Sequence, residues 1–182
     1  RESSRQKEAL TKTFKTNRNE EDWRIQMKDQ YGDVSVTKLE GNVAQCEIKR
    51  PPNNFFDHQL IMDLADCFED IDKENAIRSI VLCAEGKHFC AGANFSSSEK
   101  SAELETRTES DRNPLYDEAV RLFRCKKPVV AAIQGAAVGG GFGLALMADF
   151  RVVCPATRMT ANFVKLGFTP GFGLTHTLER IV

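Results

Sequence analysis

Three consecutive glycines, Gly139 to Gly141, open an apolar run in the segment IQGAAVGGGFGLALMADFRVV, residues 133–153. Glycine loses more backbone freedom on folding than any other residue, so three in a row inside an ordered segment are entropically unfavourable. Such a run is tolerated where the backbone needs a positive φ or where another group must approach it closely. The segment therefore predicts a tight turn at the glycines, followed directly by a helix.

The rest of the chain alternates predicted strands and helices. Apolar and polar residues alternate around EGN and predict a β-hairpin at 34–50, and apolar residues at helical spacing predict amphipathic helices at 57–72 and 114–125. Further strands are expected at 76–86, 127–135, 149–155 and 158–163, and further helices at 139–148 and 174–182. Strands alternating with helices indicate an α/β fold with helices packed on the sheets.

The two ends of the chain differ from this central pattern. Residues 1–30 are expected to form a flexible N-terminal extension, either the remainder of an Arg/Ser-rich targeting segment or a solvated, frayed end; we favour the second. Residues 31–182 are expected to form the core, which stops straight after a helical pattern and is therefore predicted to be C-terminally incomplete. The polar residues 101–113 predict a mobile loop.

Composition excludes several classes of partner. The 182 residues, 41% hydrophobic and 28% charged, suit one globular domain. A formal net charge of -1 with no basic face argues against nucleic acid, and no apolar stretch is long enough for a membrane span. The six cysteines are widely spaced and mostly lie in apolar runs, which predicts no metal site, reduced thiols and an intracellular location, cytoplasmic or mitochondrial.

Two short segments, CAGAN at 90–94 and GGGFG at 139–143, share one pattern, a turn of small residues after a predicted strand. A helix N-terminus carries unpaired N–H groups and a partial positive charge. Two such turns facing each other would direct two N–H donors at one carbonyl oxygen, which is an oxyanion hole. The alternative is a glycine-rich turn that only lets a helix pack tightly on a strand. Neither GxGxxG nor GxxxxGK[ST] is present, so phosphate-binding motifs are excluded.

The segments RSIVLCAEGKHFCAGANF, KKPVVAAIQGAAVGGGFGLALMADFRVV and VKLGFTPGFG occur in this order. Together they resemble the crotonase family of enoyl-CoA hydratases and isomerases, over residues 34–182. The resemblance implies a spiral of ββα units, the ClpP/crotonase fold, that assembles into trimers or hexamers. It also implies binding of an acyl-CoA or enoyl-CoA and stabilisation of the thioester enolate, with coenzyme A present only as part of the substrate.

By matching position, the resemblance assigns the oxyanion hole to the backbone N–H groups of Ala93 and Gly140. The segments KRPPNN and AGANF match those that cradle coenzyme A in the family. The residues implied for that role are Lys49, Ala91, Ala93, Asn94 and Phe95, and those implied for the acyl pocket are Phe142, Gly143, Phe163 and Gly171. Asp149 matches an acid of the family motif, and we expect a structural role for it.

The three positions where family members carry catalytic carboxylates hold Gly143, Phe163 and Gly171. Standard hydratase chemistry is therefore not expected, because syn addition of water needs an acid and a base. We expect an acyl-CoA enzyme of the hydratase/isomerase type with an atypical site and a base not identified from sequence. The alternatives are a catalytically weak acyl-CoA-binding relative and a thioester hydrolase or decarboxylase.

Other groups offer themselves as substitutes for the missing carboxylates. Tyr116, Asp117 and Glu118 begin the helix that follows the polar loop, where a solvated first turn is the more common role. His88 and His176 are weaker candidates, because a surface position suits both. Further aromatic residues, Phe168 and Phe172, line either a greasy acyl pocket or the core.

Overall fold

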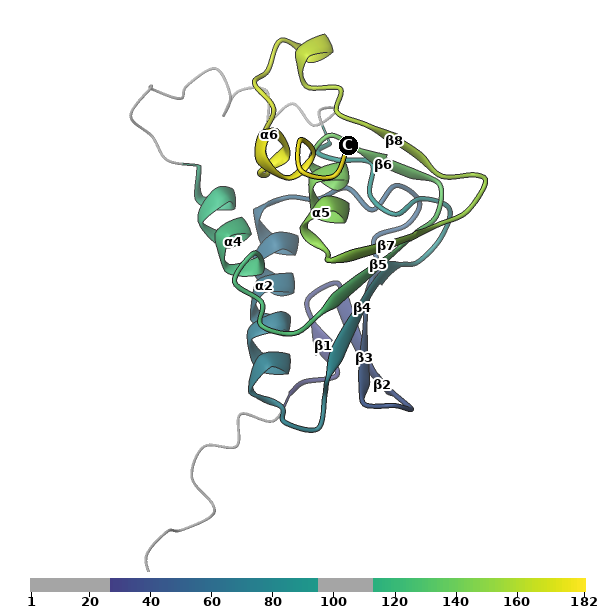
Figure 1. Ribbon diagram of the computed structural model, residues 1–182, viewed down its shortest axis with the longest axis vertical. Helices are drawn as coiled ribbons and strands as arrows, with labels where there is room; N and C mark the ends of the chain where they lie inside the picture. Colours follow the sequence, from purple (N-terminus) through teal and green to yellow (C-terminus); the bar gives the residue numbers. More distant parts are fainter. Residues whose placement is uncertain (1–26, 95–112) are drawn as a thin grey trace, which may run out of the picture.

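A six-stranded sheet forms the larger part of the computed structural model, which describes residues 27–94 and 113–182 (Figure 1). Its strands, in spatial order, are β1 (Gln30–Tyr31), β2 (Val34–Leu39), β3 (Val43–Ile48), β4 (Ser79–Ala84), β5 (Val129–Ile133) and β7 (Phe150–Val153). The first three strands pair antiparallel, and β3, β4, β5 and β7 pair parallel. The predicted α/β class is confirmed.

A second, two-stranded sheet lies beside the first. It pairs β6 (Ala136–Val138) with β8 (Arg158–Thr160) in parallel, and an isolated bridge adds Cys90 alongside Ala137. Each strand of the large sheet from β4 onward is thus followed by a residue or strand in the small sheet and then by a helix. This repeat is the ββα spiral that the family resemblance implies.

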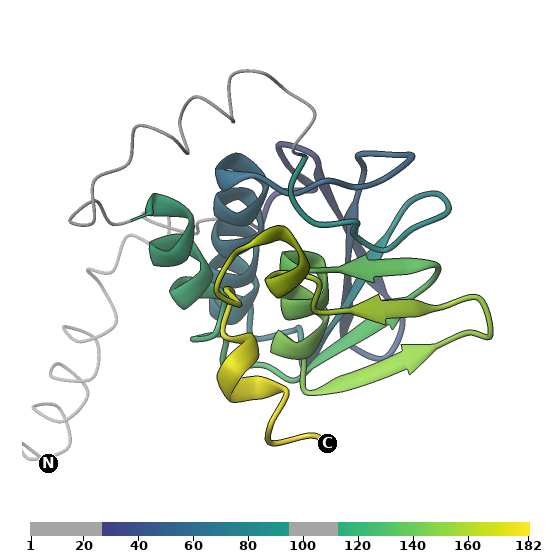
Figure 2. The same ribbon diagram turned by 90° about the horizontal axis from the view of Figure 1, so that it is seen from above.

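The helices cover one face of the large sheet. The helical elements are α2 (His58–Lys73), α4 (Pro114–Leu122), α5 (Gly140–Met147), the short 3-10 turn η1 (Val164–Leu166) and α6 (Leu174–Thr177). The two amphipathic helices α2 and α4 lie side by side, with α5 next to them when the molecule is seen from above (Figure 2). Side-chain caps fix their starts, because Asp57 accepts from the Leu60 N–H and Asn113 from the Leu115 N–H.

The predicted elements differ from the structure mainly near the C-terminus. The helix predicted at 174–182 covers only Leu174–Thr177, and the strand predicted at 158–163 covers only Arg158–Thr160. The last two residues, Ile181 and Val182, are exposed, so tertiary packing does not stabilise a helix that extends to residue 182. Strand β6 was not predicted, because three residues are too few to show a period of two.

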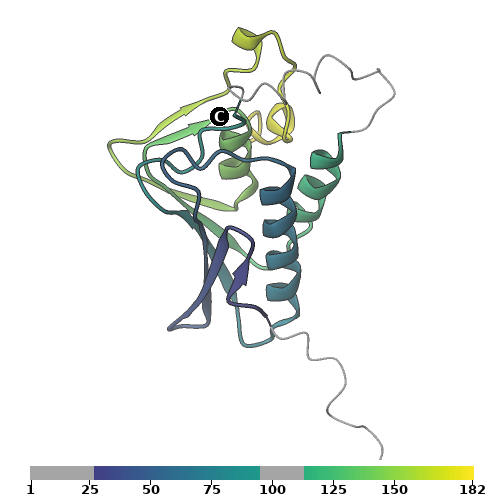
Figure 3. The same ribbon diagram turned by 180° about the vertical axis from the view of Figure 1, so that it is seen from behind.

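Burial is uneven between the two halves of the fold. The antiparallel hairpin, β4, β5 and α2 supply most of the buried apolar side chains, and Met27 belongs to the same core. Figure 3 shows α2 standing beside this part of the sheet. By contrast, Phe150, Val152 and Val164 are 64%, 60% and 75% exposed. Residues 1–26 of the predicted extension at 1–30, and residues 101–112 of the predicted loop at 101–113, lie outside the described residues. No helix in the described ranges combines the length and hydropathy of a membrane span.

Candidate functional site

A cavity of about 530 Å³ lies where the turn after β4, the start of α4, the start of α5 and the segment after β8 converge. The residues that line it are Phe56, Ala91, Gly92, Ala93, Asn113, Leu115, Tyr116, Val138, Gly139, Gly140, Asn162, Phe163, Leu166, Phe168, Thr169 and Phe172. We call it the apolar cavity, because no charged side chain is among the described residues that line it. It joins both glycine- and alanine-rich turns of the sequence.

Backbone hydrogen bonds hold these two turns side by side. The Cys90 N–H donates to the Ala136 carbonyl at 3.0 Å, and the Val138 N–H donates to the Cys90 carbonyl at 3.0 Å. Gly92 has φ +84°, and a Cβ there would lie 2.7 Å from the Val138 carbonyl oxygen. The same Cβ position is 4.0 Å from the Gly140 nitrogen. The turn at 90–94 therefore reaches the N-terminus of α5 only because residue 92 is glycine.

Two backbone N–H groups in these turns have no hydrogen-bond acceptor among the described residues. Gly140 begins α5, and neither its N–H nor that of Ala93 donates to any acceptor within the described part of the chain. The helix start adds its partial positive charge to the Gly140 N–H. Both residues line the apolar cavity. The predicted pair of donors is thus brought to one cavity, with the electrostatics that an anion or a polarised carbonyl oxygen requires.

The structure also shows what the three glycines make room for. Gly139 has φ 55° and ψ -119°, a conformation that L side chains rarely adopt. A Cβ at Gly140 would overlap the ring of Phe56, and a Cβ at Gly141 would overlap the Cys90 carbonyl. The glycines therefore allow close packing around the start of α5, which is the second of the two interpretations of the sequence, and the oxyanion hole stays a prediction.

The three positions without a carboxylate are filled or apolar. A Cβ at Gly143 would lie 2.8 Å from the Phe172 Cβ, so the aromatic residue occupies that space. A Cβ at Gly171 would overlap the Tyr116 hydroxyl. Phe163 lines the apolar cavity. Packing thus leaves no space for a side chain at position 143 and places the phenol of Tyr116 at position 171.

The polar side chains among the described lining residues are Asn113, Tyr116, Asn162 and Thr169. The other substitutes considered from sequence lie elsewhere. Glu118 binds Arg121 at 2.5 Å, and His88 Nδ1 accepts from the Ala136 N–H at 3.1 Å. His176 is exposed and does not line the cavity. Tyr116 is the one of these candidates that reaches it.

Asp149 and the residues expected to bind coenzyme A are placed as follows. Asp149 accepts from the Val129 N–H at 2.8 Å and so ties the start of β5 to β7, a structural role. Ala91 and Ala93 line the cavity. Lys49 is exposed with its Nζ 3.5 Å from a Glu47 carboxylate oxygen, outside the lining. Asn94, the residue after Ala93, is not among the lining residues, and Phe95 lies outside the described residues.

Aromatic side chains form much of the cavity wall. Phe163, Phe168 and Phe172 line it, whereas Phe142 is buried below with Leu146 and Leu174 and belongs to the core. The Phe56 and Phe172 rings lie 5.8 Å apart at 54°. Phe56 was not predicted from sequence. Its only local signal is its place two residues after the segment KRPPNN, which was expected near the ligand.

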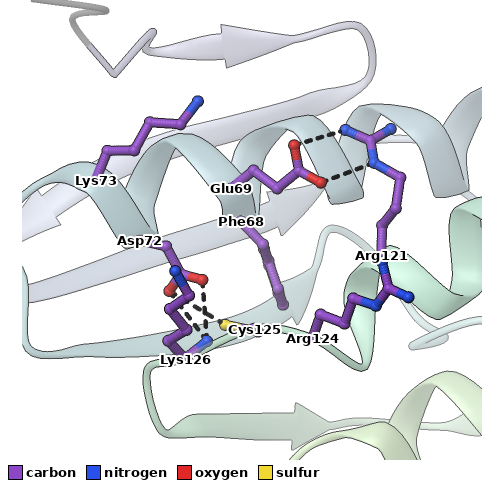
Figure 4. Close-up of a pocket in the computed structure, with 8 residues that line it drawn as sticks. All are labelled: Phe68, Glu69, Asp72, Lys73, Arg121, Arg124, Cys125 and Lys126. Atoms are coloured by element: carbon purple, nitrogen blue, oxygen red, sulfur yellow. Dashed lines mark hydrogen bonds and ion pairs between the residues drawn. The ribbon is translucent and has the colours of Figure 1, made fainter.

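A second cavity of about 430 Å³ lies between α2 and α4 and has the opposite character (Figure 4). We call it the charged cavity; its lining residues are Phe68, Glu69, Asp72, Lys73, Arg121, Arg124, Cys125 and Lys126. Arg121 binds Asp66 at 2.6 Å, Glu69 at 2.8 Å and Glu118 at 2.5 Å. Asp72 accepts from the Lys126 N–H at 2.9 Å.

Hydrogen bonds and burial shift several pKa values around the two cavities. Hydrogen bonds to Glu69 and Asp66 hold the pKa of Arg121 well above its ordinary value, and the hydrogen bond from Arg121 lowers the pKa of Glu69. Burial raises the pKa of Cys125 to about 11 and that of Cys90, behind the apolar cavity, to about 12. None of the six cysteines, all within the described ranges, forms a disulfide.

Known proteins resemble this chain over most of its length. The sequence model described as enoyl-CoA hydratase/isomerase matches residues 38–182. "Probable enoyl-CoA hydratase EchA14" of Mycobacterium tuberculosis is 34% identical over 151 residues, which are 82% of this chain and 58% of that protein. Bacillaene synthase decarboxylase PksI of Bacillus subtilis is 32% identical over 148 residues, 81% of this chain and 57% of that protein.

A solved structure shares the fold. Enoyl-CoA hydratase subunit I of Geobacillus kaustophilus aligns with a TM-score of 0.73 at 30% identity, over 84% of this chain and 58% of that one. The chain thus spans a little over half the length of these three relatives. In the described part of the chain, no three His, Cys, Asp or Glu side chains come together as a metal site.

Proposed function

The chain belongs to the enoyl-CoA hydratase/isomerase family, and on that premise we propose that its apolar cavity binds an acyl-CoA or enoyl-CoA thioester and stabilises the thioester enolate. The observation that carries the proposal is the pair of backbone N–H groups, Ala93 and Gly140, left open at one cavity. Donors fixed in a water-poor site stabilise a developing oxyanion without reorganising.

The lining of the cavity fits the acyl part of such a ligand. A volume of about 530 Å³ is in the range of small-molecule sites, and aromatic walls suit an apolar acyl group. Ala91 and Ala93 line the cavity, and we expect them to contact the ligand near its thioester. Coenzyme A enters as part of the substrate, and no separate cofactor is proposed.

Self-association is part of the proposal. Apolar side chains of β7 and η1 are exposed, and large exposed apolar areas mark interaction surfaces in soluble proteins. A trimer or hexamer would cover this surface, as the family resemblance implies. Sedimentation velocity of the chain tests it, because a monomer at all concentrations would contradict the assembly.

Two further functions stay open for this cavity. A catalytically weak acyl-CoA-binding protein is favoured by the lack of an acid or base pair among the described lining residues. Thioester hydrolysis or decarboxylation is favoured by the same observation, because an oxyanion hole then carries most of the chemistry. A decarboxylase is also among the similar proteins.

A matched pair of substitutions at Gly140 tests the proposal. Gly140→Ala and Gly140→Pro both add a Cβ that meets Phe56, but only proline removes the N–H. Each protein is incubated with a panel of acyl- and enoyl-CoAs in deuterated buffer and read by mass spectrometry. Loss of one oxyanion donor is expected to slow turnover about 100- to 1,000-fold in the proline variant relative to the alanine variant.

The outcomes separate the candidate functions. Equal turnover by both variants would exclude the oxyanion hole. Deuterium in the acyl chain, a gain of water, free coenzyme A or loss of CO₂ would each identify the reaction. Binding of acyl-CoA by calorimetry, without any of these products, would favour the binding protein.

A further inference from the structure

Tyr116 is the polar side chain that packing directs most specifically at the apolar cavity. It lies in the first turn of α4, where its N–H donates to the Asn113 carbonyl at 2.9 Å. Asn113 Oδ1 in turn accepts from the Leu115 N–H at 3.1 Å. These bonds fix the backbone that carries the phenol. The side chain is 45% exposed and lines the cavity.

Gly171 holds the space for the Tyr116 hydroxyl. A Cβ on Gly171 would overlap that oxygen, so any other residue at 171 would displace it. The next residue, Phe172, is buried against Phe56 and Phe123, which fixes the segment that faces α4. The phenol therefore sits between two packed segments from distant parts of the chain.

Among the described residues that line the cavity, Tyr116 has the side chain best suited to transfer a proton. The other polar side chains among its described lining residues are two amides and an aliphatic hydroxyl, Asn113, Asn162 and Thr169. Tyrosine belongs to the residue types that act as general acids in enzymes, whereas asparagine amides do not. A phenol O–H can give a proton to a carbanion, and no carboxylate or imidazole is among the described lining residues to take one, so the described site holds an acid without a base.

An enolate can form without a base when a carbon–carbon bond supplies its electrons. In a β-carboxyacyl thioester, the bond from Cα to the carboxylate breaks and its electron pair becomes the enolate. CO₂ leaves, and the negative charge moves to the thioester oxygen. A proton from a phenol O–H then adds to Cα, and water reprotonates the phenolate, so one proton is consumed per CO₂ released.

The wall of the cavity favours this charge movement. Phe163, Phe168 and Phe172 are apolar, and no Lys or Arg is among the described lining residues to stabilise a bound carboxylate. A carboxylate held there is desolvated, whereas the departing CO₂ is neutral. The charge moves to the thioester oxygen, which the N–H groups of Ala93 and Gly140 would stabilise by hydrogen bonds.

Resting on the proposed thioester binding, we propose that Tyr116 is the catalytic acid of this cavity and that the substrate is a β-carboxyacyl thioester. The phenol delivers its proton to Cα of the enolate left by CO₂. Because Tyr116 stands on one wall, delivery occurs from one face of the planar enolate.

Methylmalonyl-CoA in deuterated buffer tests the proposal, since its decarboxylation creates a CHD stereocentre in propionyl-CoA. Wild type is compared with Tyr116→Phe and with Tyr31→Phe, a matched control because Tyr31, the only other tyrosine, bonds Asp70 in the core. Wild type and Tyr31→Phe are expected to give one enantiomer. Tyr116→Phe is expected to give a racemic product at a rate lowered about 100-fold, with unchanged affinity for propionyl-CoA.

Gly171→Ala gives an independent check, because it displaces the hydroxyl while keeping the phenol in the chain. It is expected to act as Tyr116→Phe does. A single enantiomer from Tyr116→Phe would overturn the role of the phenol. Binding of propionyl-CoA by wild type without CO₂ release would overturn the inference and leave the proposed thioester site standing. Absence of binding would overturn both.

Discussion

The two cavities of this fold differ in whether their polar groups are hydrogen-bonded within the protein. In the charged cavity, Arg121 is bound to three carboxylates and Asp72 to the Lys126 backbone. In the apolar cavity no charged side chain is among the described lining residues, yet two backbone N–H groups are open. Polar groups shielded from water are normally hydrogen-bonded, so two N–H groups without an acceptor among the described residues set this cavity apart from the charged one.

The difference follows from where each cavity lies in the fold. The charged cavity lies between the sides of two helices, where long side chains meet and pair with each other. The apolar cavity lies at turns and at the start of α5, where the backbone itself faces outward. Variants that disturb one cavity and spare the other therefore separate what each contributes to stability and to ligand binding.

The largest effect is expected from Gly141→Ala. The new Cβ would overlap the Cys90 carbonyl, which is backbone and cannot turn aside. We expect a loss of about 2–3 kcal/mol in the free energy of unfolding, together with loss of acyl-CoA affinity as the two turns separate. Urea denaturation and calorimetry measure the two quantities. Gly41→Ala is the control, because nothing lies within 4 Å of its Cβ and only left-handed strain of about 1 kcal/mol applies.

A smaller effect is expected when Arg121 becomes Gln in the charged cavity. Three carboxylates lose their common partner, but the side chains of Asp66 and Glu69 are about half exposed, and solvent screens them. The free energy of unfolding should fall by about 1 kcal/mol, while acyl-CoA affinity stays as in wild type. A change in that affinity would show that the two cavities are coupled.

The same cavity predicts an acid-dependent loss of stability. Arg121 lowers the pKa of Glu69 in the folded chain, so the stabilisation is present above the unfolded pKa, about 4.3, and is lost as pH falls through the folded value. Urea midpoints measured from neutral pH downward should decline over this window in wild type. Arg121→Gln should decline less; a parallel decline would assign the effect to other carboxylates.

The smallest effect concerns thiol reactivity and leaves stability unchanged. Cys154 is exposed, and a hydrogen bond from Thr157 lowers its pKa. Burial raises the pKa of Cys125 to about 11 at the charged cavity and of Cys90 to about 12 behind the apolar one. Iodoacetamide should therefore modify Cys154 first, Cys125 slowly and Cys90 only on unfolding. Peptide mapping by mass spectrometry checks the order, and early labelling of Cys90 would mean that the apolar cavity opens.

Local pattern was enough to predict most of the fold. Alternation in residues 34–50 and helical spacing from Leu60 to Ile71 follow from the periods of strands and helices, and the structure confirms both. The sequence also showed the two small-residue segments that hold Ala93 and Gly140 as turns, each following a predicted strand. The short strand β6 and the early end of α6 were missed, because they depend on pairing with β8 and on packing rather than on period.

The order of the elements, the costly turn at Gly139 to Gly141 and the lack of acids at positions 143, 163 and 171 can be read from the sequence, because each is a property of neighbouring residues. What fills the space beside those residues depends on the tertiary packing. Phe56 packs on Gly140, Phe172 on Gly143 and the Tyr116 hydroxyl on Gly171. These contacts join segments separated by 29 to 84 residues along the chain. Such distant contacts are set by how the layers pack, and no local period encodes them.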